Sequence, residues 1–141
     1  MDRERAQEWL DAYVAAWRSY DADEIGALFS EDVSYRYYPY AEPVVGREAV
    51  VASWLGQSDD AEADDAESAS STASSRDAPG TYEASYAPVA VDGDVVVATG
   101  TSTYYDEPGG AVTQVFDNCF VLQFDDAGRC RAFTEYYTKR P

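Results

Sequence analysis

Apolar residues recur at helical spacing in three stretches near the N-terminus. The first, residues 6–20, follows the i, i+3/i+4, i+7 rhythm of a helix with one buried face. Aspartates in the break at 21–23 cap a short second helix, and a third helix opens at 46–48. The apolar positions of the three predicted helices are Trp9, Leu10, Tyr13, Val14 and Trp17, then Ile25, Leu28 and Phe29, then Val50, Val51, Trp54 and Leu55.

The rest of the pattern is typical of β-strands. Residues 33–38 predict a first strand, which Pro39 and Pro43 end because proline cannot donate a hydrogen bond to a sheet. After residue 80, apolar and polar positions alternate between turn signals such as Asp92-Gly93-Asp94. Four more strands are expected, at 81–91, 95–105, 112–124 and 129–138. Helices first and strands afterwards predict an α+β domain whose helices cover one face of the sheet.

The composition changes abruptly between the third helix and the next strand. Residues 56–79 are dominated by Ser, Ala, Asp and Glu, and contain no aromatic or β-branched aliphatic residue. Such a segment cannot bury enough apolar area to offset the entropy lost on ordering. We expect an acidic, low-complexity, mobile insertion within a single domain that spans residues 1–141. A solvated loop is favoured over a segment that binds a partner.

The charge balance narrows the partners and the compartment. Ten basic and 27 acidic side chains give a net charge of −17, and nine of the ten bases are arginine. Nucleic acid is disfavoured because like charges repel the phosphate backbone. Many carboxylates and one lysine are typical of a halophilic protein, whose charges stay hydrated and screened in a salt-rich cytoplasm; a merely acidic protein is the alternative. Without a signal peptide or a long apolar run, the sequence predicts a cytoplasmic protein that binds no membrane.

The last predicted hairpin indicates which side chains share a face. A turn centred on residues 126–127 pairs strand positions whose numbers sum to about 253, and alternation then sorts the side chains by face. One face is aromatic with a single polar pair, as a ligand pocket requires; the other is smaller and mixed, and suits contact with a second subunit. The pairs on the aromatic face are Phe116 with Tyr137, Asn118 with Glu135, Phe120 with Phe133, and Leu122 with Arg131.

Cysteine and histidine usage limits the chemistry further. Cys119 is expected on the mixed face opposite Thr134, roughly 14 Å from Cys130, so both cysteines should be free thiols. The sequence contains no histidine, which excludes a Ser-His-Asp triad, a Cys-His dyad and a zinc site with histidine. Proton transfer would fall to Asp, Glu, Tyr or water. No phosphate loop, metal-ligand cluster or dinucleotide fingerprint occurs, and we expect neither a metal nor a cofactor.

This order of elements resembles the nuclear transport factor 2-like superfamily and, more narrowly, its SnoaL-like group. The resemblance rests on Tyr35-Arg36-Tyr37-Tyr38-Pro39, on Val45-Gly46-Arg47-Glu48-Ala49-Val50, and on residues 124–129 followed by Glu135-Tyr136-Tyr137. It covers nearly the whole chain outside the acidic insertion. It implies three N-terminal helices packed on a curved, mainly antiparallel sheet that forms a cone with an internal pocket, and a homodimer through the outer face of the sheet.

Glu135 is the leading candidate for function. Aromatic surroundings would raise the pKa of its carboxyl group and suit it to act as a base or an acid; alternatively, the carboxylate binds Asn118 or a tyrosine and only fixes the sheet. Tyr13 and Tyr37 are candidate catalytic partners, as phenols that donate to an oxyanion, or else ordinary core residues. The remaining candidates, as ligand-binding residues, are Asn118, Tyr35, Phe116, Phe120, Phe133, Tyr137, Trp17 and Trp54.

Two classes of function stay open. The first is a SnoaL-like pocket protein that binds a small, mostly apolar molecule. The second is a cofactor-independent isomerase, dehydratase, cyclase or hydrolase with Glu135 as base and a pocket tyrosine as acid. Resemblance to the superfamily's ketosteroid isomerases matches their helix tyrosine with Tyr13, but the positions of their two acids fall at Tyr37 and Phe120. The missing acids favour binding over steroid isomerisation by that mechanism.

Overall fold

The computed structural model describes residues 1–56 and 76–141, so most of the insertion predicted at 56–79 lies outside the described residues. The elements are α1 (Arg3–Ser19), α2 (Ala22–Ala27), β1 (Phe29–Arg36), β2 (Val44–Val45), α3 (Arg47–Trp54), β3 (Tyr82–Asp92), β4 (Val95–Tyr105), β5 (Val112–Phe124) and β6 (Cys130–Lys139). These strands form one sheet in the order β2-β1-β6-β5-β4-β3. β1 and β6 pair in parallel, and all other neighbours are antiparallel. The predicted α+β class is confirmed.

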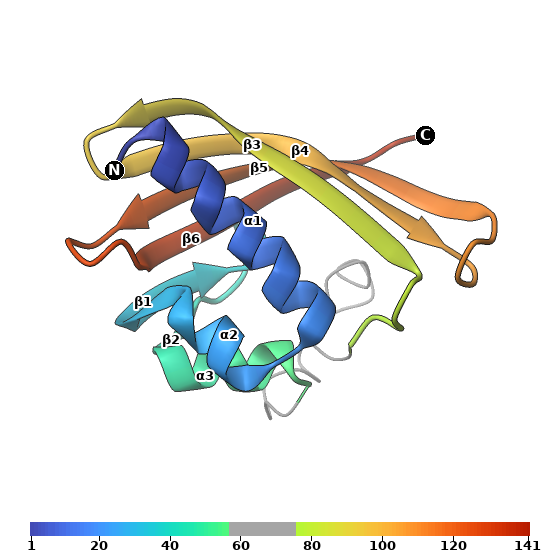
Figure 1. Cartoon of the computed structure of the whole chain (residues 1–141), viewed down its shortest axis with the longest axis horizontal. Helices are drawn as coiled ribbons and strands as arrows, with labels where there is room; N and C mark the ends of the chain where they lie inside the picture. Colours follow the sequence, from blue (N-terminus) through green and yellow to red (C-terminus); the bar gives the residue numbers. More distant parts are fainter. Residues whose placement is uncertain (57–75) are drawn as a thin grey trace.

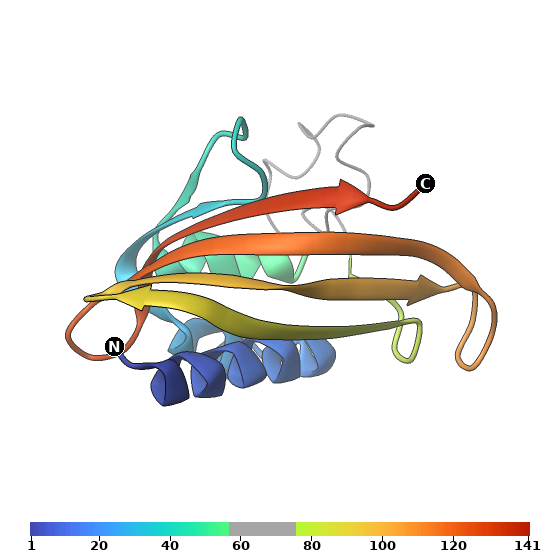
Figure 2. The ribbon, with the colours of Figure 1, turned by 90° about the horizontal axis from the view of Figure 1, so that it is seen from above.

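The helices lie on one side of a curved sheet. In Figure 1, α1 crosses in front of the long strands, and α2 and α3 lie beside β1 and β2. Figure 2, turned by 90°, shows the strands bowed over the helices. α1 packs chiefly against β3, whereas α3 packs against β1. The concave face of the sheet and the underside of α1 therefore enclose the interior.

Sequence signals fix both ends of α1. Its first turn is capped by the Asp2 carboxylate, which accepts a hydrogen bond from the Arg5 N–H at 2.8 Å. It ends at Tyr20, whose φ of 50° is left-handed and whose N–H donates to the Ala16 carbonyl at 2.8 Å. The predicted apolar stripe is buried except for the half-buried Val14. Among the described helices, none combines the length and the apolar character needed to cross a membrane.

The first strand begins earlier than predicted. Phe29, expected on the second helix, opens β1, which ends at Arg36 rather than at residue 38. The cause is pairing with β6: the Cys130 N–H donates to the Leu28 carbonyl at 2.9 Å, and Phe29 pairs with Cys130. This tertiary pairing outweighs the local helical spacing. β2 was not predicted, because two residues are too short to show an alternating pattern.

The β5–β6 register differs from the predicted one by two residues. Asn118 pairs with Tyr137 and Phe120 with Glu135, so partner numbers sum to 255 instead of 253. The hairpin loop is longer than expected: the Asp125 N–H donates to the Arg129 carbonyl at 2.8 Å, and a register shift follows between residues 123 and 124. A slip of two residues preserves alternation, so Asn118 and Glu135 still share the inner face.

The same bulge overturns two placements near the turn. Arg131, expected on the inner face opposite Leu122, is exposed and lies 3.5 Å from Asp94. Leu122 pairs with Phe133 instead. Cys130, expected on the outer face, is buried in the core. Cys119 pairs with Tyr136 rather than with Thr134, and both cysteines are free thiols, as predicted.

Aromatic rings fill the interior under the N-terminal half of α1. Trp9 stacks on Tyr13 with ring centroids 5.6 Å apart, and Phe133 stacks on Tyr35 at 4.2 Å with the planes within 2° of parallel. Phe120 packs against both Tyr13 and Phe133. Contacts of this kind add roughly 0.5–1.5 kcal/mol per pair beyond the buried area. This packed layer is the floor of the site described next.

Candidate functional site

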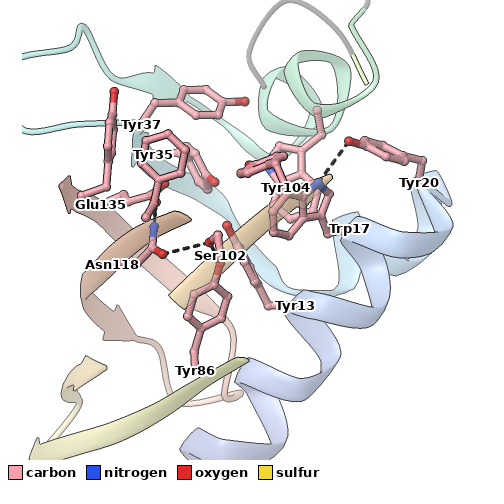
Figure 3. Close-up of a pocket in the computed structure, with 13 residues that line it drawn as sticks. Tyr13, Trp17, Tyr20, Tyr35, Tyr37, Tyr86, Ser102, Tyr104, Asn118 and Glu135 are labelled. Atoms are coloured by element: carbon pink, nitrogen blue, oxygen red, sulfur yellow. Dashed lines mark hydrogen bonds between the residues drawn. The ribbon is translucent and has the colours of Figure 1, made fainter. Parts of the chain in front are cut away.

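A cavity opens between the C-terminal half of α1, the concave face of the sheet and α3 (Figure 3). Its volume is about 50 Å³, counted as the space open to the centres of water molecules. One water needs roughly 10–15 Å³ on this measure, so the cavity suits a small ligand. Its walls consist of nine aromatic side chains besides Phe116, with three polar ones. They are Tyr13, Trp17, Tyr20, Tyr35, Tyr37, Trp54, Tyr86, Ser102, Tyr104, Phe116, Asn118, Glu135 and Tyr137.

Strand alternation delivers most of these side chains. β4, β5 and β6 each contribute two residues spaced by two, as does the end of β1, because every second side chain on a strand points to the same face. α1 adds Tyr13 and Trp17, which lie one turn apart, and Tyr20 follows at its C-cap. The contributing pairs on the strands are Tyr35 and Tyr37, Ser102 and Tyr104, Phe116 and Asn118, and Glu135 and Tyr137.

A chain of hydrogen bonds crosses three strands and ends on Glu135. Asn118 Nδ2 donates to Glu135 Oε2 at 2.6 Å, and Ser102 Oγ donates to Asn118 Oδ1 at 2.8 Å. Because Ser102 uses its only hydrogen on Asn118, the Tyr86 hydroxyl is the donor in its 2.7 Å bond to Ser102 Oγ. Figure 3 shows Ser102 and Asn118 between Tyr86 and Glu135. All donors point toward the carboxylate, which stabilises its ionised form.

Burial nevertheless dominates the electrostatics of Glu135. Desolvation raises the pKa of its carboxyl group from 4.5 to about 7, and the hydrogen bond from Asn118 acts in the opposite direction. Burial likewise raises the pKa of Tyr13, Tyr35 and Tyr86 above the usual value for tyrosine, and the charge of Glu135 adds to the effect. The site therefore holds a half-buried carboxyl group of raised pKa among protonated phenols.

A second carboxylate lies near the other end of the cavity. Trp17 Nε1 donates to Asp77 Oδ2 at 3.0 Å, and the Tyr20 hydroxyl is 3.4 Å from the same oxygen. The Asp77 N–H in turn donates to the Tyr20 hydroxyl at 2.9 Å. Burial raises the pKa of Asp77 above its usual value. These bonds tie the chain after the acidic segment to two aromatic walls of the cavity.

Trp54 places an indole N–H donor in the wall of the cavity. Its Nε1–H is buried and makes no hydrogen bond within the described part of the chain. It lies near the Tyr35 hydroxyl, where it lowers the pKa of that phenol against the larger effect of burial. An unpaired buried donor costs roughly 1–3 kcal/mol, which an acceptor on a ligand or a water would recover.

The structure brings together nine of the residues singled out from sequence. Glu135, Tyr13, Tyr37, Asn118, Tyr35, Phe116, Tyr137, Trp17 and Trp54 all line the cavity. The Tyr37 hydroxyl is 2.6 Å from Ser53 Oγ on α3, which holds the ring in place. Whether any of these residues binds a ligand or takes part in a reaction stays a prediction.

Phe120 and Phe133 were expected to contact the ligand. They belong instead to the packed aromatic layer that forms the floor of the cavity. Each is 1% exposed, and both are covered by Tyr13. They share the face of Glu135 but lie toward the turn, where α1 closes on the sheet and leaves no space. Sequence alternation assigns a face but does not say how far along the strand a helix covers it.

Four lining residues were missed from sequence: Tyr20, Tyr86, Ser102 and Tyr104. Ser102 and Tyr104 alternate with exposed-side residues on β4, so a register for β4–β5 would have found them, since Ser102 pairs with Phe116. Tyr20 follows a helix end and shows no periodic signal. Within residues 1–56 and 76–141, no three acidic or cysteine side chains come together as metal ligands would.

Comparison with known proteins bears on the fold. The model of the SnoaL-like domain matches residues 10–70. A proposed ketosteroid isomerase from Kribbella flavida DSM 17836 has a TM-score of 0.64 and 16% identity, over 99% of this chain and 82% of that one. An LEH-like epoxide hydrolase of M. tuberculosis has a TM-score of 0.59 and 17% identity, over 96% and 84%. An NTF-2 like protein of unknown function from Burkholderia xenovorans LB400 has a TM-score of 0.60 and 16% identity, over 96% and 84%.

At such low identities the solved structures establish the fold and leave the activity open. No protein of curated function matches the chain in sequence. The domain match and the structural likeness agree with each other and with the motifs in the sequence. The resemblance predicted from sequence is thereby confirmed: residues 10–70 match the SnoaL-like domain, and the chain has the fold of nuclear transport factor 2-like proteins.

Proposed function

We propose that this chain binds a small, mostly apolar molecule in the cavity beneath α1. The observation that carries the proposal is one carboxyl group, fixed by a chain of neutral hydrogen bonds, in a hollow whose other walls are mostly aromatic. Apolar walls with few placed polar groups are the usual composition of a ligand site. Asn118 and Glu135 would orient the ligand, and the Trp54 Nε1–H would meet an acceptor on it.

The test is to identify what the folded protein retains. The protein is purified at high salt, unfolded, and the released small molecules are identified by mass spectrometry. We expect a stoichiometric small molecule from the wild type and a strong loss from Asn118→Leu, which removes the amide from the pocket. Tyr136→Phe, on the outer face of the same hairpin, serves as the control and should retain the ligand. An empty wild-type protein, or equal retention by Asn118→Leu, would contradict the proposal.

A second candidate function is acid/base catalysis by Glu135. It is favoured by one observation: burial brings the carboxyl pKa to about 7, where a group accepts and returns protons most readily, and protonated Tyr13 and Tyr35 lie in the same cavity. The retained molecule is incubated with the protein in D₂O, and exchange of its carbon-bound hydrogens is followed by mass spectrometry. Glu135→Gln should slow exchange about 100-fold or more with binding intact. Equal exchange rates in wild type and variant would contradict catalysis by Glu135 and would support the binding function without a reaction.

We further propose a homodimer through the outer face of β5 and β6. Val121 and Tyr136 are 38% and 46% exposed there, next to a shallow groove lined by Cys119 and Tyr38. Covering these apolar surfaces favours association with a second copy. Light scattering at high salt should give twice the chain mass for the wild type and the chain mass for Val121→Asp. A monomeric wild type would refute the dimer.

A further inference from the structure

The cavity holds a carboxyl group, Glu135, that no basic side chain of the described residues contacts. Neither arginine nor lysine is among its described lining residues, and within residues 1–56 and 76–141 the neutral amide of Asn118 is the group that favours ionised Glu135. The segment 57–75 contains no basic residue in its sequence either. Glu135 is half-buried, and a desolvated carboxylate without a cationic partner favours taking up a proton or gaining a cation from outside.

Six of the nine arginines make contacts with groups other than Glu135. Two form ion pairs on the surface, Arg131 with Asp94 and Arg140 with Asp117. Four others donate to backbone carbonyls: Arg3 to Pro88, Arg36 to Ala41, Arg47 to Phe29 and Arg76 to Leu55. Arg76 also lies over the ring of Tyr20, 5.4 Å from its centroid, and does not contact Glu135. None of these six guanidinium groups contacts the Glu135 carboxylate.

The walls around this carboxyl group suit a cation as well. Tyrosine and tryptophan rings present negative π faces, and a cation within about 6 Å of a ring centroid is attracted to them. Tyr35 and Tyr37 lie beside Glu135, and Tyr104 and Trp17 lie farther along the cavity toward Tyr20 (Figure 3). Trp54 lines the same cavity. A neutral apolar ligand would use the area of these rings but would leave the carboxylate unpaired.

Two longer-range charges act in the same direction. Asp77, hydrogen-bonded to Trp17 and Tyr20, adds a second carboxylate beside the aromatic walls. The whole chain carries a net charge of −17, which concentrates cations and repels anions around the opening. An anionic ligand would meet repulsion from Glu135, from Asp77 and from the surface.

We infer that the pocket selects a small organic cation, with an amine or quaternary ammonium group against the Glu135 carboxylate and its carbon substituents against the tyrosine and tryptophan rings. The inference rests on the proposed binding function and names the class of its ligand. The polar chain from Tyr86 to Asn118 holds the carboxylate in place for this contact. The small cavity favours a compact cation of few carbon atoms.

The test compares two probes of the same shape. Choline and 3,3-dimethylbutan-1-ol differ only in a charged nitrogen replaced by carbon, and Trp17 and Trp54 report binding by fluorescence, with calorimetry at constant high salt for the dissociation constants. We expect choline to bind wild-type protein about tenfold or more tightly than the alcohol. Glu135→Gln should bring the two dissociation constants within about twofold. Glu8→Gln, which makes the same charge change on the exposed face of α1, should preserve the wild-type ratio.

Two substitutions of Tyr104 test how much the aromatic rings contribute to binding of the cation. Tyr104→Leu should weaken choline about fivefold while Tyr104→Phe, which keeps the π face, changes it by less than about twofold. Equal or tighter binding of the alcohol by wild type overturns the cation inference and leaves the apolar binding function standing. Binding of neither probe also overturns it. The proposed function itself fails only if, in addition, no small molecule is released from the purified wild-type protein.

Discussion

At the scale of single residues, Glu135 is a carboxyl group whose ionisation the described fold disfavours. Its carboxyl group has a pKa of about 7 in the folded chain and 4.5 in its ordinary environment, because burial disfavours the ionised form. This difference corresponds to roughly 3 kcal/mol against folding once the group is ionised. The hydrogen bond from Asn118 reduces the cost without removing it. A residue retained at such a cost is typical of a functional site.

The first prediction follows from the sign of this pKa difference. Between pH 4.5 and about 7 the folded chain binds more protons at Glu135 than the unfolded chain, so this residue's contribution to stability is full below pH 4.5 and is lost as the pH rises through 7. Glu135→Gln removes the titration. The free energy of unfolding of the variant minus that of the ligand-free wild type should therefore grow by up to roughly 3 kcal/mol from pH 5 to pH 8.

Urea unfolding at several pH values measures this difference. Other carboxylates titrate in the same range, but they are common to both proteins and cancel in the subtraction. Glu8→Gln, at an exposed position of α1, should give a difference that stays flat above pH 5. A flat difference for Glu135→Gln as well would mean that its carboxylate is fully solvated in the folded protein.

Sequence reasoning identified Glu135 because its environment follows from alternation alone. A carboxyl group spaced by two from Phe133 and Tyr137 must share their face, whatever the register of the partner strand. Tyr86 and Tyr20 depend instead on where β3 and the end of α1 lie in space. Neither position has a local signal that separates a cavity wall from ordinary core.

At the scale of elements, the face of the sheet on which a side chain lies could be predicted from sequence, whereas the pairing register of the strands could not. Side chains of β5 and β6 keep their predicted faces when the register differs by an even number of residues. The loop at residues 125–129 shifts the pairing by two residues, so the faces are preserved. The outcome placed Asn118 diagonally to Glu135, and the amide still reaches the carboxylate. Where the bulge breaks the alternation, at Cys130 and Arg131, the predicted faces were wrong. Loop conformation, which depends on tertiary fit, decides such details.

Gly100 shows how one strand position shapes the cavity. It pairs with Tyr86 on one side and Asn118 on the other, between the two inward residues Ala98 and Ser102. A Cβ at this position would lie 2.0 Å from the Ser85 carbonyl oxygen and 2.5 Å from the Tyr86 ring. The missing side chain therefore lets β3 and Tyr86 approach β4 closely. The Tyr86–Ser102 hydrogen bond requires this approach.

The second prediction concerns Gly100→Ala. Because the clash involves backbone, which cannot move aside cheaply, the substitution should lower the free energy of unfolding by about 3 kcal/mol or more, at the upper end of overpacking effects. Urea unfolding measures the loss. Gly26→Ala is the matched control, since its added Cβ meets only side chains at 3.6 Å or more on a helix and should change stability by less than about 1 kcal/mol. Equal effects of the two substitutions would show that β3 and β4 are not closely apposed at Gly100.

At the scale of the whole molecule, the net charge of −17 opposes the compact state. Carboxylates on the surface repel one another, and folding brings them closer together than in the unfolded chain. The two surface ion pairs of the described chain, Arg131 with Asp94 and Arg140 with Asp117, are exposed and contribute little, about 1 kcal/mol each at most. Attraction on the surface therefore does not balance the repulsion.

The last prediction is that salt stabilises the fold and that charge repulsion is the reason. The screening length falls from about 30 Å at 0.01 M salt, which spans the molecule, to about 3 Å at 1 M. The melting temperature should thus rise by about 10 °C between these conditions, which corresponds to roughly 3 kcal/mol for a chain of this size. Calorimetry in NaCl measures the rise. The triple variant Glu8→Gln, Glu31→Gln and Glu42→Gln neutralises three exposed carboxylates and changes the net charge from −17 to −14. It should melt higher than wild type at low salt and gain less from added salt. If wild type and variant gained equally, salt would act through apolar burial, which the three substitutions leave untouched, and the acidic surface would not be what makes the fold depend on salt.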